Sequence, residues 1–205
     1  MKQTLIICFS LILASCNYAQ NNKSLLGGPC EGCEAVHEYG NQKLTSKATL
    51  SDFYQKGQQI KITGTVYQKD GKTPAHNVLL YVYHTDQNGK YTAKSNAIGW
   101  EKRHGSIRGW MKTDEKGQYT FYTLKPASYP SRSEPAHIHL TVKEPNKKEY
   151  YMDSFYFHDD PLLTDKIKDL LKNRGGNGIL KLKKEKEWLV GKRDIVLGEN
   201  IPHYY

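Results

Sequence analysis

The sequence predicts an all-β protein: an antiparallel β-sandwich with long loops and one short helix in the C-terminal half. Tyrosine is unusually frequent, with 15 residues against 5 Phe, and aromatic residues favour strands. Segments of strand length recur along the chain, separated by turns that contain Gly, Asn and Asp. Strands at this spacing, joined by hairpin turns, favour an antiparallel sandwich over βαβ units.

The elements follow from local patterns. Residues 60–67 alternate apolar and polar side chains, as a half-buried strand does, and a turn at 69–72 follows. Further strands are predicted at residues 77–84, 118–124, 137–143, 150–157, 178–182 and 188–196. A helix is predicted from about residue 163 to residue 173, with Ile167, Leu170 and Leu171 as its apolar stripe. Long loops are predicted at 93–105 and 125–136, and long loops in a compact sandwich usually carry function.

The N-terminus predicts export. Lys2 precedes a short apolar run and then small residues, which is a secretory signal too short to span a membrane. Residues 13–16 (LASC) resemble a bacterial lipobox, so Cys16 is predicted to carry lipid after cleavage. Residues 1–16 are then the signal, 17–28 a tether and 29–205 one domain. The expected location is the cell envelope, in the periplasm or on the outer membrane; ordinary cleavage after Ala19 or Gln20 would give a secreted protein instead.

The net charge of +9 invites a nucleic-acid interpretation, which the charge pattern does not favour. The late lysines alternate with Glu185 and Glu187 rather than with aromatic residues, as on a solvated helix and hairpin. No nucleic-acid partner is therefore predicted, and the oligomeric state is left open. Cys30 and Cys33 form a CxxC pair without a second pair or a nearby His pair, so a local disulfide is expected in an oxidising compartment.

A candidate metal site begins at His137 and His139. In a strand these two side chains point to the same side and can reach one metal ion. Imidazole pairs suit zinc, copper, iron or nickel, and an H-x-H pair alone is often only packing. Tyr91 and Tyr129 lie in turn-rich loops; a hard, highly charged cation can capture their phenolates. Two phenolates with two imidazoles favour Fe(III), whereas the alternative is a pair of loop tyrosines with solvated hydroxyls.

These residues belong to an ordered set of short motifs. It runs through Gly64-Thr65-Val66, Asp86, Gly89-Lys90-Tyr91, Arg108-Gly109, Thr113-Asp114, Gly117-Gln118-Tyr119, Tyr129-Pro130, His137-Ile138-His139, Tyr156-Phe157 and Asp160-Pro161. From about Ile60 to the end, the chain resembles the intradiol ring-cleavage dioxygenases, the family of the catechol and protocatechuate enzymes. The resemblance implies an immunoglobulin-like β-sandwich and a mononuclear Fe(III) held by Tyr91, Tyr129, His137 and His139.

The resemblance also implies an activity. A catechol-type diol and O2 would be the substrates, and the ring would be cut between its two hydroxyl-bearing carbons to give a muconate-type diacid. Tyr129 would leave the iron when the diol binds and accept one of its protons. The loop at 93–105 offers Asn96, Trp100, Lys102 and Arg103, whose charges would suit a carboxylated or polyphenolic catechol.

Two departures from the family bear on catalysis. The family carries an Arg shortly before the Pro-Ala-His segment, where this chain has Glu134; Arg132 is the expected substitute for that charge. The family also often has a Gln where this chain has Ser154. A missing charge clamp can cost several kcal/mol of transition-state stabilisation. The alternatives are therefore an exported module that binds iron and catecholates without turnover, or a structural lipoprotein without metal.

Overall fold

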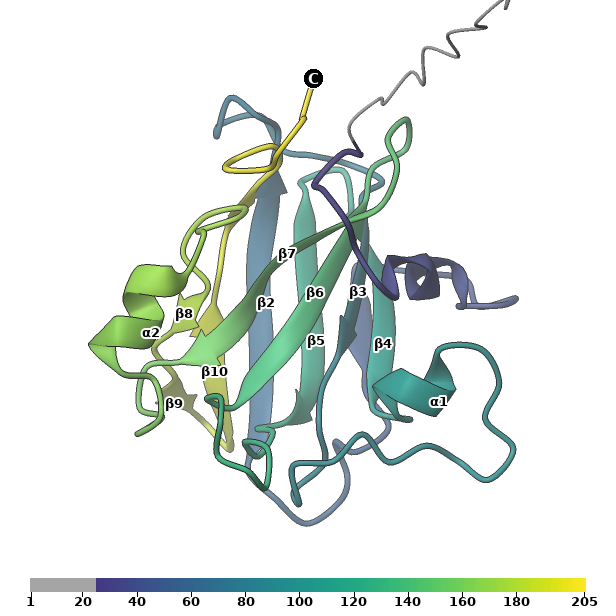
Figure 1. Ribbon diagram of the computed structural model, residues 1–205. Coiled ribbons are helices and arrows are strands. Elements are labelled where there is room, and N and C mark those ends of the chain that lie inside the picture. The colour runs from purple at the N-terminus through teal and green to yellow at the C-terminus, as the bar shows by residue number, and fades with distance from the viewer. Residues whose placement is uncertain (1–24) are drawn as a thin grey trace, which may run out of the picture.

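The computed structural model describes residues 25–205, which form two packed sheets (Figure 1). The first sheet has the order β1 (Lys47–Thr49), β5 (Gln118–Leu124), β2 (Gln59–Tyr67), β10 (Trp188–Lys192) and β9 (Lys183–Glu185), and β11 (Ile195–Val196) also pairs with β2. The second has the order β4 (Arg108–Lys112), β3 (Leu79–Tyr83), β6 (His137–Lys143), β7 (Tyr150–Phe157) and β8 (Ile179–Leu180).

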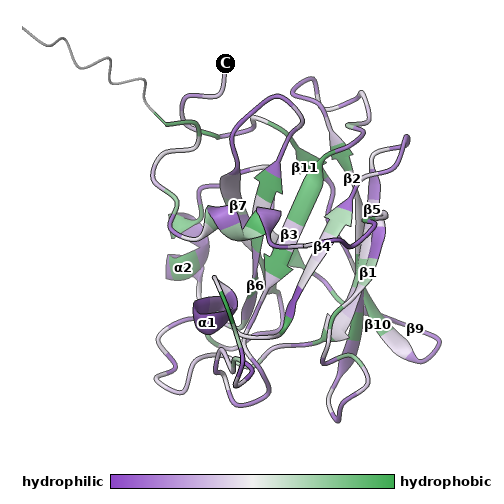
Figure 2. Ribbon diagram, turned by 90° about the vertical axis from the view of Figure 1, so that its right-hand side faces the viewer, coloured by the Kyte–Doolittle hydropathy of each residue, from purple (hydrophilic) through white to green (hydrophobic). Residues whose placement is uncertain are grey.

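The core lies between the sheets and follows from the alternation of side chains along each strand. In β2 every second residue is buried, including Ile60 and Ile62. The facing strands contribute Ile138 and Phe155, and the Phe155 ring meets Phe121 of the first sheet edge-on at 5.6 Å. Figure 2 shows the hydrophobic colour concentrated in the strands, while the short helix α1 (Glu101–His104) is hydrophilic.

The sheets are mixed, which corrects the prediction of a wholly antiparallel sandwich. The pairs β2–β5, β3–β4, β3–β6, β6–β7 and β9–β10 are antiparallel, as expected. However, β1 runs parallel to β5, β10 and β11 run parallel to β2, and β8 runs parallel to β7. No parallel pair is joined by a hairpin turn, because its two strands are far apart in the sequence. The turn residues therefore do not predict the direction of these strands. The immunoglobulin-like topology stays a prediction.

The helix prediction was too long. α2 covers Asp165–Leu170, and its N-cap Thr164 accepts a hydrogen bond from the Ile167 amide, as expected of a capping residue. None of its residues is buried, and Leu170 is 64% exposed. The predicted apolar stripe therefore does not face the core.

A smaller apolar cluster covers the outer face of the second sheet. The 3₁₀ helix η1 (Cys33–His37) brings Ala35 and Val36 onto Tyr81 of β3 and Trp110 of β4. Figure 1 shows η1 and α1 beside the β4 edge of this sheet. The cluster matters because it anchors the segments that surround the candidate site.

The predicted signal, Cys16 and most of the predicted tether lie outside the described residues. The tether's last four residues, 25–28, contact the domain: the Gly27 amide donates to Pro202 O, and Leu26 packs against the main core. No helix within residues 25–205 is long and apolar enough to cross a membrane.

Candidate metal centre

Alternation along β3 and β6 places one half of the site. Leu80, Val82, Ile138 and Leu140 point into the core, so the neighbouring Tyr83, His137 and His139 point to the outer face of the sheet. Tyr83 and His139 are partners in the antiparallel register, and their rings stack with centroids 4.4 Å apart. The two histidines therefore share one face, as the H-x-H spacing predicted.

Two loops bring in the tyrosines. Asp86 organises the first loop by accepting hydrogen bonds from the amides of Asn88 and Lys90 and from the Thr92 hydroxyl. Thr85 ties this loop to the second by donating its hydroxyl to Ala127 O at 2.6 Å. Gly89 has φ +71°, and a Cβ there would lie 2.1 Å from Ser128 O. Only glycine lets the two loops approach this closely, which is how Tyr91 and Tyr129 meet.

Four donor atoms converge at this point. Tyr91 Oη lies 2.9 Å from Tyr129 Oη and 2.8 Å from His139 Nε2. His137 Nε2 lies 3.1 Å from His139 Nε2 and 3.5 Å from Tyr129 Oη. Ligand atoms that each lie about 2 Å from one metal ion are about 3 Å apart. The spacing of the four atoms therefore fits a single shared metal ion.

Burial favours the neutral forms of Tyr91, Tyr129 and His139. It raises the pKa of Tyr91 well above its ordinary value, and the hydrogen-bonded Tyr129 raises it further; burial also raises the pKa of Tyr129. Burial and then the neighbouring His137 lower the pKa of His139. Neutral imidazole is the form that binds metal. A phenol with a raised pKa ionises only beside a strongly charged cation, so the tyrosines fit a hard, highly charged ion.

The orientation of His137 also fits metal binding. Its Nδ1 lies 2.8 Å from Pro135 O and donates to that carbonyl, which leaves the Nε2 lone pair free to face the cluster. Among residues 25–205, no three His, Cys, Asp or Glu side chains gather closely enough to hold a metal. A metal in this part of the chain would therefore depend on the two phenols.

An aromatic stack supports the cluster from one side. The Tyr83 ring lies between His139 and His104, at 3.8 Å from the His104 ring and only 6° from parallel to it. His104 in turn stacks on Trp100, with centroids 5.1 Å apart. Tyr81 Oη lies 2.9 Å from His104 Nδ1 and fixes that ring. The stack helps to hold the plane of the His139 ring by packing against its face.

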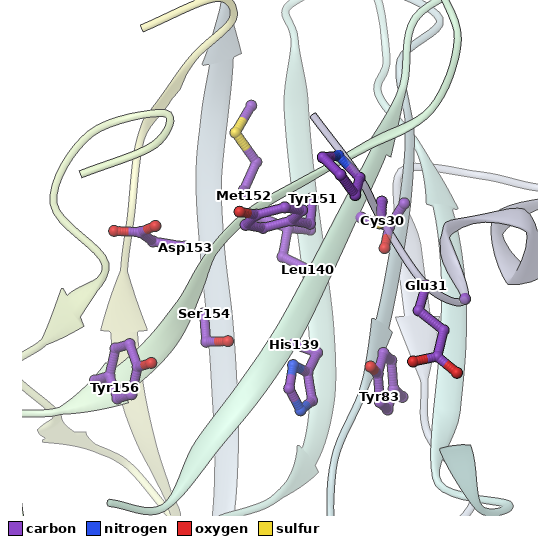
Figure 3. A pocket seen from close by; sticks show the side chains of 13 residues that line it. Cys30, Glu31, Tyr83, His139, Leu140, Tyr151, Met152, Asp153, Ser154 and Tyr156 are labelled. Atoms are coloured by element: carbon purple, nitrogen blue, oxygen red, sulfur yellow. The ribbon is translucent and has the colours of Figure 1, made fainter. Parts of the chain in front are cut away.

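Two pockets open at the donor cluster. One, of about 350 Å³, is lined by Tyr91, Tyr129, His139, Tyr83, Trp100, His104, Glu31 and Arg103. The other, of about 320 Å³, shares His139, Tyr83 and Glu31 with it and continues along β6 and β7 (Figure 3). Glu31 and Arg103 form an ion pair at the rim.

Some wall residues escaped the sequence analysis. Glu31 and Gly32 lie within the CxxC loop, where Cys30 and Cys33 are joined by a disulfide with Cα atoms 5.7 Å apart. A Cβ at Gly32 would lie 2.6 Å from His104 Nε2, so this loop presses on the aromatic stack. Tyr83 could have been predicted from the sequence, since strand alternation places it on the same face of the sheet as the predicted site. Glu31 could not, because it reaches the site only through tertiary packing.

Arg132 is not brought to the site. Its side chain is exposed, its backbone has φ 53°, and its amide donates to Tyr129 O in a tight turn. Glu134 is also exposed, whereas Ser154 lines the second pocket. Among the described residues, the Lys or Arg that lines the donor pocket is Arg103, which comes from the 93–105 loop. The structure therefore offers no support for Arg132 as the substitute for the missing charge.

Comparison with known proteins decides the family. A family profile described as "Dioxygenase" matches residues 31–194. The chain belongs to the intradiol dioxygenase family. A curated relative is catechol 1,2-dioxygenase 2 from Acinetobacter lwoffii, which is 28% identical over 134 residues. That match covers 58% of this chain and 46% of the relative, so the chain spans about half the length of the relative that it matches.

Solved structures of other dioxygenases share the fold. The dioxygenase domain of a dioxygenase carbohydrate-binding protein fusion from Streptomyces sp. SirexAA-E has a TM-score of 0.57 at 22% identity, covering 76% of this chain and 91% of that one. The 3-chlorocatechol 1,2-dioxygenase from Rhodococcus opacus 1CP has a TM-score of 0.57 at 21% identity, covering 74% and 64%. An intradiol ring-cleavage dioxygenase from Tetranychus urticae gives 0.53 at 17% identity, covering 76% and 87%.

Proposed function

We propose that this protein is a non-haem Fe(III) intradiol dioxygenase that cleaves a catechol-type ring between its hydroxyl-bearing carbons, using O2 and giving a muconate-type diacid. The observation that carries the proposal is the convergence of Tyr91, Tyr129, His137 and His139, in a chain of this family, at the mouth of two pockets. These four residues would hold the iron. Bound there, Fe(III) would supply the Lewis acidity that makes a chelated diol reactive toward O2.

The two tyrosines have different roles in this proposal. Tyr91 Oη has short contacts to both Tyr129 and His139. Among residues 25–205, Tyr129 Oη has only the contact to Tyr91 and a longer one of 3.5 Å to His137. Tyr129 is therefore the more weakly held phenol. It would give up its place to the diol and take one of the diol's protons on its Oη, acting as a base within the site. Tyr91 would remain in place.

The test is a visible absorption spectrum of the iron-loaded protein, with and without catechol under nitrogen, followed by air. A tyrosinate-to-iron band that shifts with catechol and then decays as oxygen is consumed is the expected result. Tyr91→Phe should weaken and shift the band, because only the Tyr129 phenolate would remain, while Tyr54→Phe, which alters an exposed tyrosine outside the site, should leave it unchanged. Absence of any band from the wild-type protein would remove both phenols from the metal.

A second candidate is a module that binds iron and catecholates without turnover. The observation in its favour is the charge around the donor pocket: Arg103 lines it, but Glu31 pairs with Arg103, and Arg132 is exposed. Less charge stabilisation would then be available to the reacting ring. This candidate predicts a band that shifts with catechol and persists in air.

We also propose that the protein is exported and anchored by lipid at Cys16, which would place the domain in the cell envelope. The support is the LASC segment after a short apolar run. Metabolic labelling with a palmitate analogue tests the anchor. Label on the wild-type protein but not on Cys16→Ala is expected, and label that survives the substitution would exclude Cys16 as the lipidated residue.

A further inference from the structure

The second pocket has no part in the proposed chemistry at the four donors, yet it begins at one of them. His139, Tyr83 and Glu31 line both pockets, so the groove along β6 and β7 adjoins the space beside the donors. At about 350 and 320 Å³, each space lies at the lower end of the range for sites that take drug-sized ligands. A single-ring diol would leave the groove empty.

The lining of the groove is aromatic and hydroxylated. Beyond His139 it offers Tyr156, Ser154 and, at the far end, Tyr151. Figure 3 shows His139 and Tyr83 at one end of the groove, Ser154 further along, and Tyr151 toward the other end. Phenol rings stack with other aromatic rings, and their hydroxyls accept and donate hydrogen bonds. These surfaces suit a flat, neutral ring.

Tyr151 is held ready for such a contact. The Arg174 guanidinium lies over its ring, 3.5 Å from the centroid. Arg174 is itself buried and donates to Gly27 O at 3.0 Å, so it cannot swing away easily. Tyr151 nevertheless remains 40% exposed and lines the groove. A fixed, accessible aromatic side chain binds a ring with little loss of side-chain entropy.

The charges of the groove discriminate against acids. Its charged lining residues are Glu31 and Asp153, and within the described chain no Lys or Arg lines it. Glu31 is paired with Arg103 at the rim. Asp153 Oδ2 is buried without a hydrogen-bond partner among the described residues. A carboxylate on the far part of a substrate would lose water here without gaining a cation among the lining residues, since Arg174 lies against the Tyr151 ring and is itself buried.

We infer that the groove from His139 to Tyr151 is a subsite for the tail of a ring-extended catechol, one that carries a second, uncharged aromatic ring. This inference rests on the proposed function, because the diol end is placed at the four donors. It makes Tyr151 a specificity-determining residue, whose role is to stack on the second ring. It also means that a carboxylated catechol, which the charges of the 93–105 loop suggested, is the poorer fit.

The test is calorimetric binding to the iron-loaded protein under nitrogen, where no turnover occurs, with three probes: catechol, 4-phenylcatechol, and 4-phenylcatechol with a carboxylate on its second ring. The neutral two-ring probe should bind at least about twofold more tightly than catechol, which corresponds to the lower end of the range for an aromatic pair. The carboxylated probe should bind more weakly than the neutral one. In Tyr151→Ala the preference for 4-phenylcatechol over catechol should fall toward one.

Two variants serve as controls. Tyr151→Phe keeps the ring and should keep the preference, which separates stacking from a general disturbance of β7. Tyr54→Ala removes a tyrosine that is 84% exposed outside the groove and should leave all three dissociation constants unchanged. Thermal unfolding of each variant shows that it is folded.

The possible failures are distinct. A wild-type protein that binds catechol but shows no preference for 4-phenylcatechol overturns the subsite and leaves the proposed function standing. A preference that survives in Tyr151→Ala overturns the role of Tyr151. Tighter binding of the carboxylated probe overturns the charge argument. A protein that binds none of the probes overturns both the subsite and the proposed function.

Discussion

His104 illustrates how burial sets the charge of single residues around the site. It lies in the aromatic stack with Tyr83 and Trp100, and burial together with the nearby Arg108 lowers its pKa to about 4, although Glu38 acts in the opposite direction. A neutral His104 can accept the Tyr81 hydroxyl at Nδ1. Protonation would place a cation inside the stack, so this residue links the packing of the site to pH.

We predict that His104 makes the protein less stable in acid. Its folded pKa of about 4 lies below the ordinary value of 6.5, so between these values the unfolded chain binds a proton that the folded chain does not. Stability therefore rises with pH across this window and falls as pH drops from 6.5 toward 4. The free energy of unfolding, measured by urea titration at several pH values, should depend less steeply on pH in His104→Gln. An unchanged slope would contradict the assignment.

At the level of elements, the site depends on two loops that touch. The loop after β3 carries Tyr91, and the loop after β5 carries Tyr129. Thr85 bonds one loop to the other, and Gly89 lies against Ser128 O. The strand histidines are fixed by sheet register, but the tyrosines keep their places only while these loops stay in contact. Iron binding should therefore be sensitive to changes that separate the loops without touching any ligand.

Gly89→Ala tests this dependence. A methyl group would be placed 2.1 Å from Ser128 O, so the loops must separate and iron uptake, measured by metal analysis after reconstitution, should fall severalfold. The matched control is Gly71→Ala. Gly71 also has positive φ, at +66°, but within the part of the chain that the structure describes its added Cβ would meet only Val196, at 4.0 Å. Both variants should lose about 1–2 kcal/mol of stability from backbone strain. Equal iron uptake in the two would contradict the loop argument.

At the scale of the whole molecule, the sequence predicts the features that neighbouring residues determine and misses those that depend on contacts between distant segments. The bounds of β5, β6 and β7 agree with the predicted strands, because alternation and flanking turns are both strong there. β4 was missed because Arg108–Lys112 contains Gly109 and does not alternate; it packs because Gly109 lets Leu50 approach. The His pair follows from strand period alone. The place of Glu31 in the groove wall cannot be predicted in this way, because it depends on an ion pair with Arg103, which lies 72 residues away in the sequence.

Arg193 is the residue that best shows how the two sheets are joined at their edge. It lies between β10 and β11, which both pair with β2 of the first sheet, and it is buried. Its Nη1 donates to Asp153 O at 2.7 Å and to Ser154 O at 3.4 Å on β7 of the second sheet. Its Nη2 donates to Arg174 O at 3.2 Å and to Gly176 O at 3.5 Å in the segment after α2. One guanidinium thus satisfies carbonyls from two segments.

Replacing Arg193 should therefore destabilise the whole protein rather than one sheet. Arg193→Met has similar length but removes the guanidinium donor from the Asp153, Ser154 and Gly176 carbonyls, whereas Arg174 O keeps the Asp153 amide. The expected cost is about 2–4 kcal/mol, since each buried unsatisfied group costs about 1–3 kcal/mol. Arg193→Lys keeps a charge but loses the planar fork, and should fall between Met and wild type. Lys192→Met alters a neighbouring side chain that is 67% exposed and should change stability by less than about 0.5 kcal/mol.

The measurement is the urea unfolding midpoint followed by both tyrosine fluorescence and far-ultraviolet circular dichroism. Coincident transitions at a lower midpoint are expected; a wild-type midpoint in Arg193→Met would show that the sheets are held together without this contact.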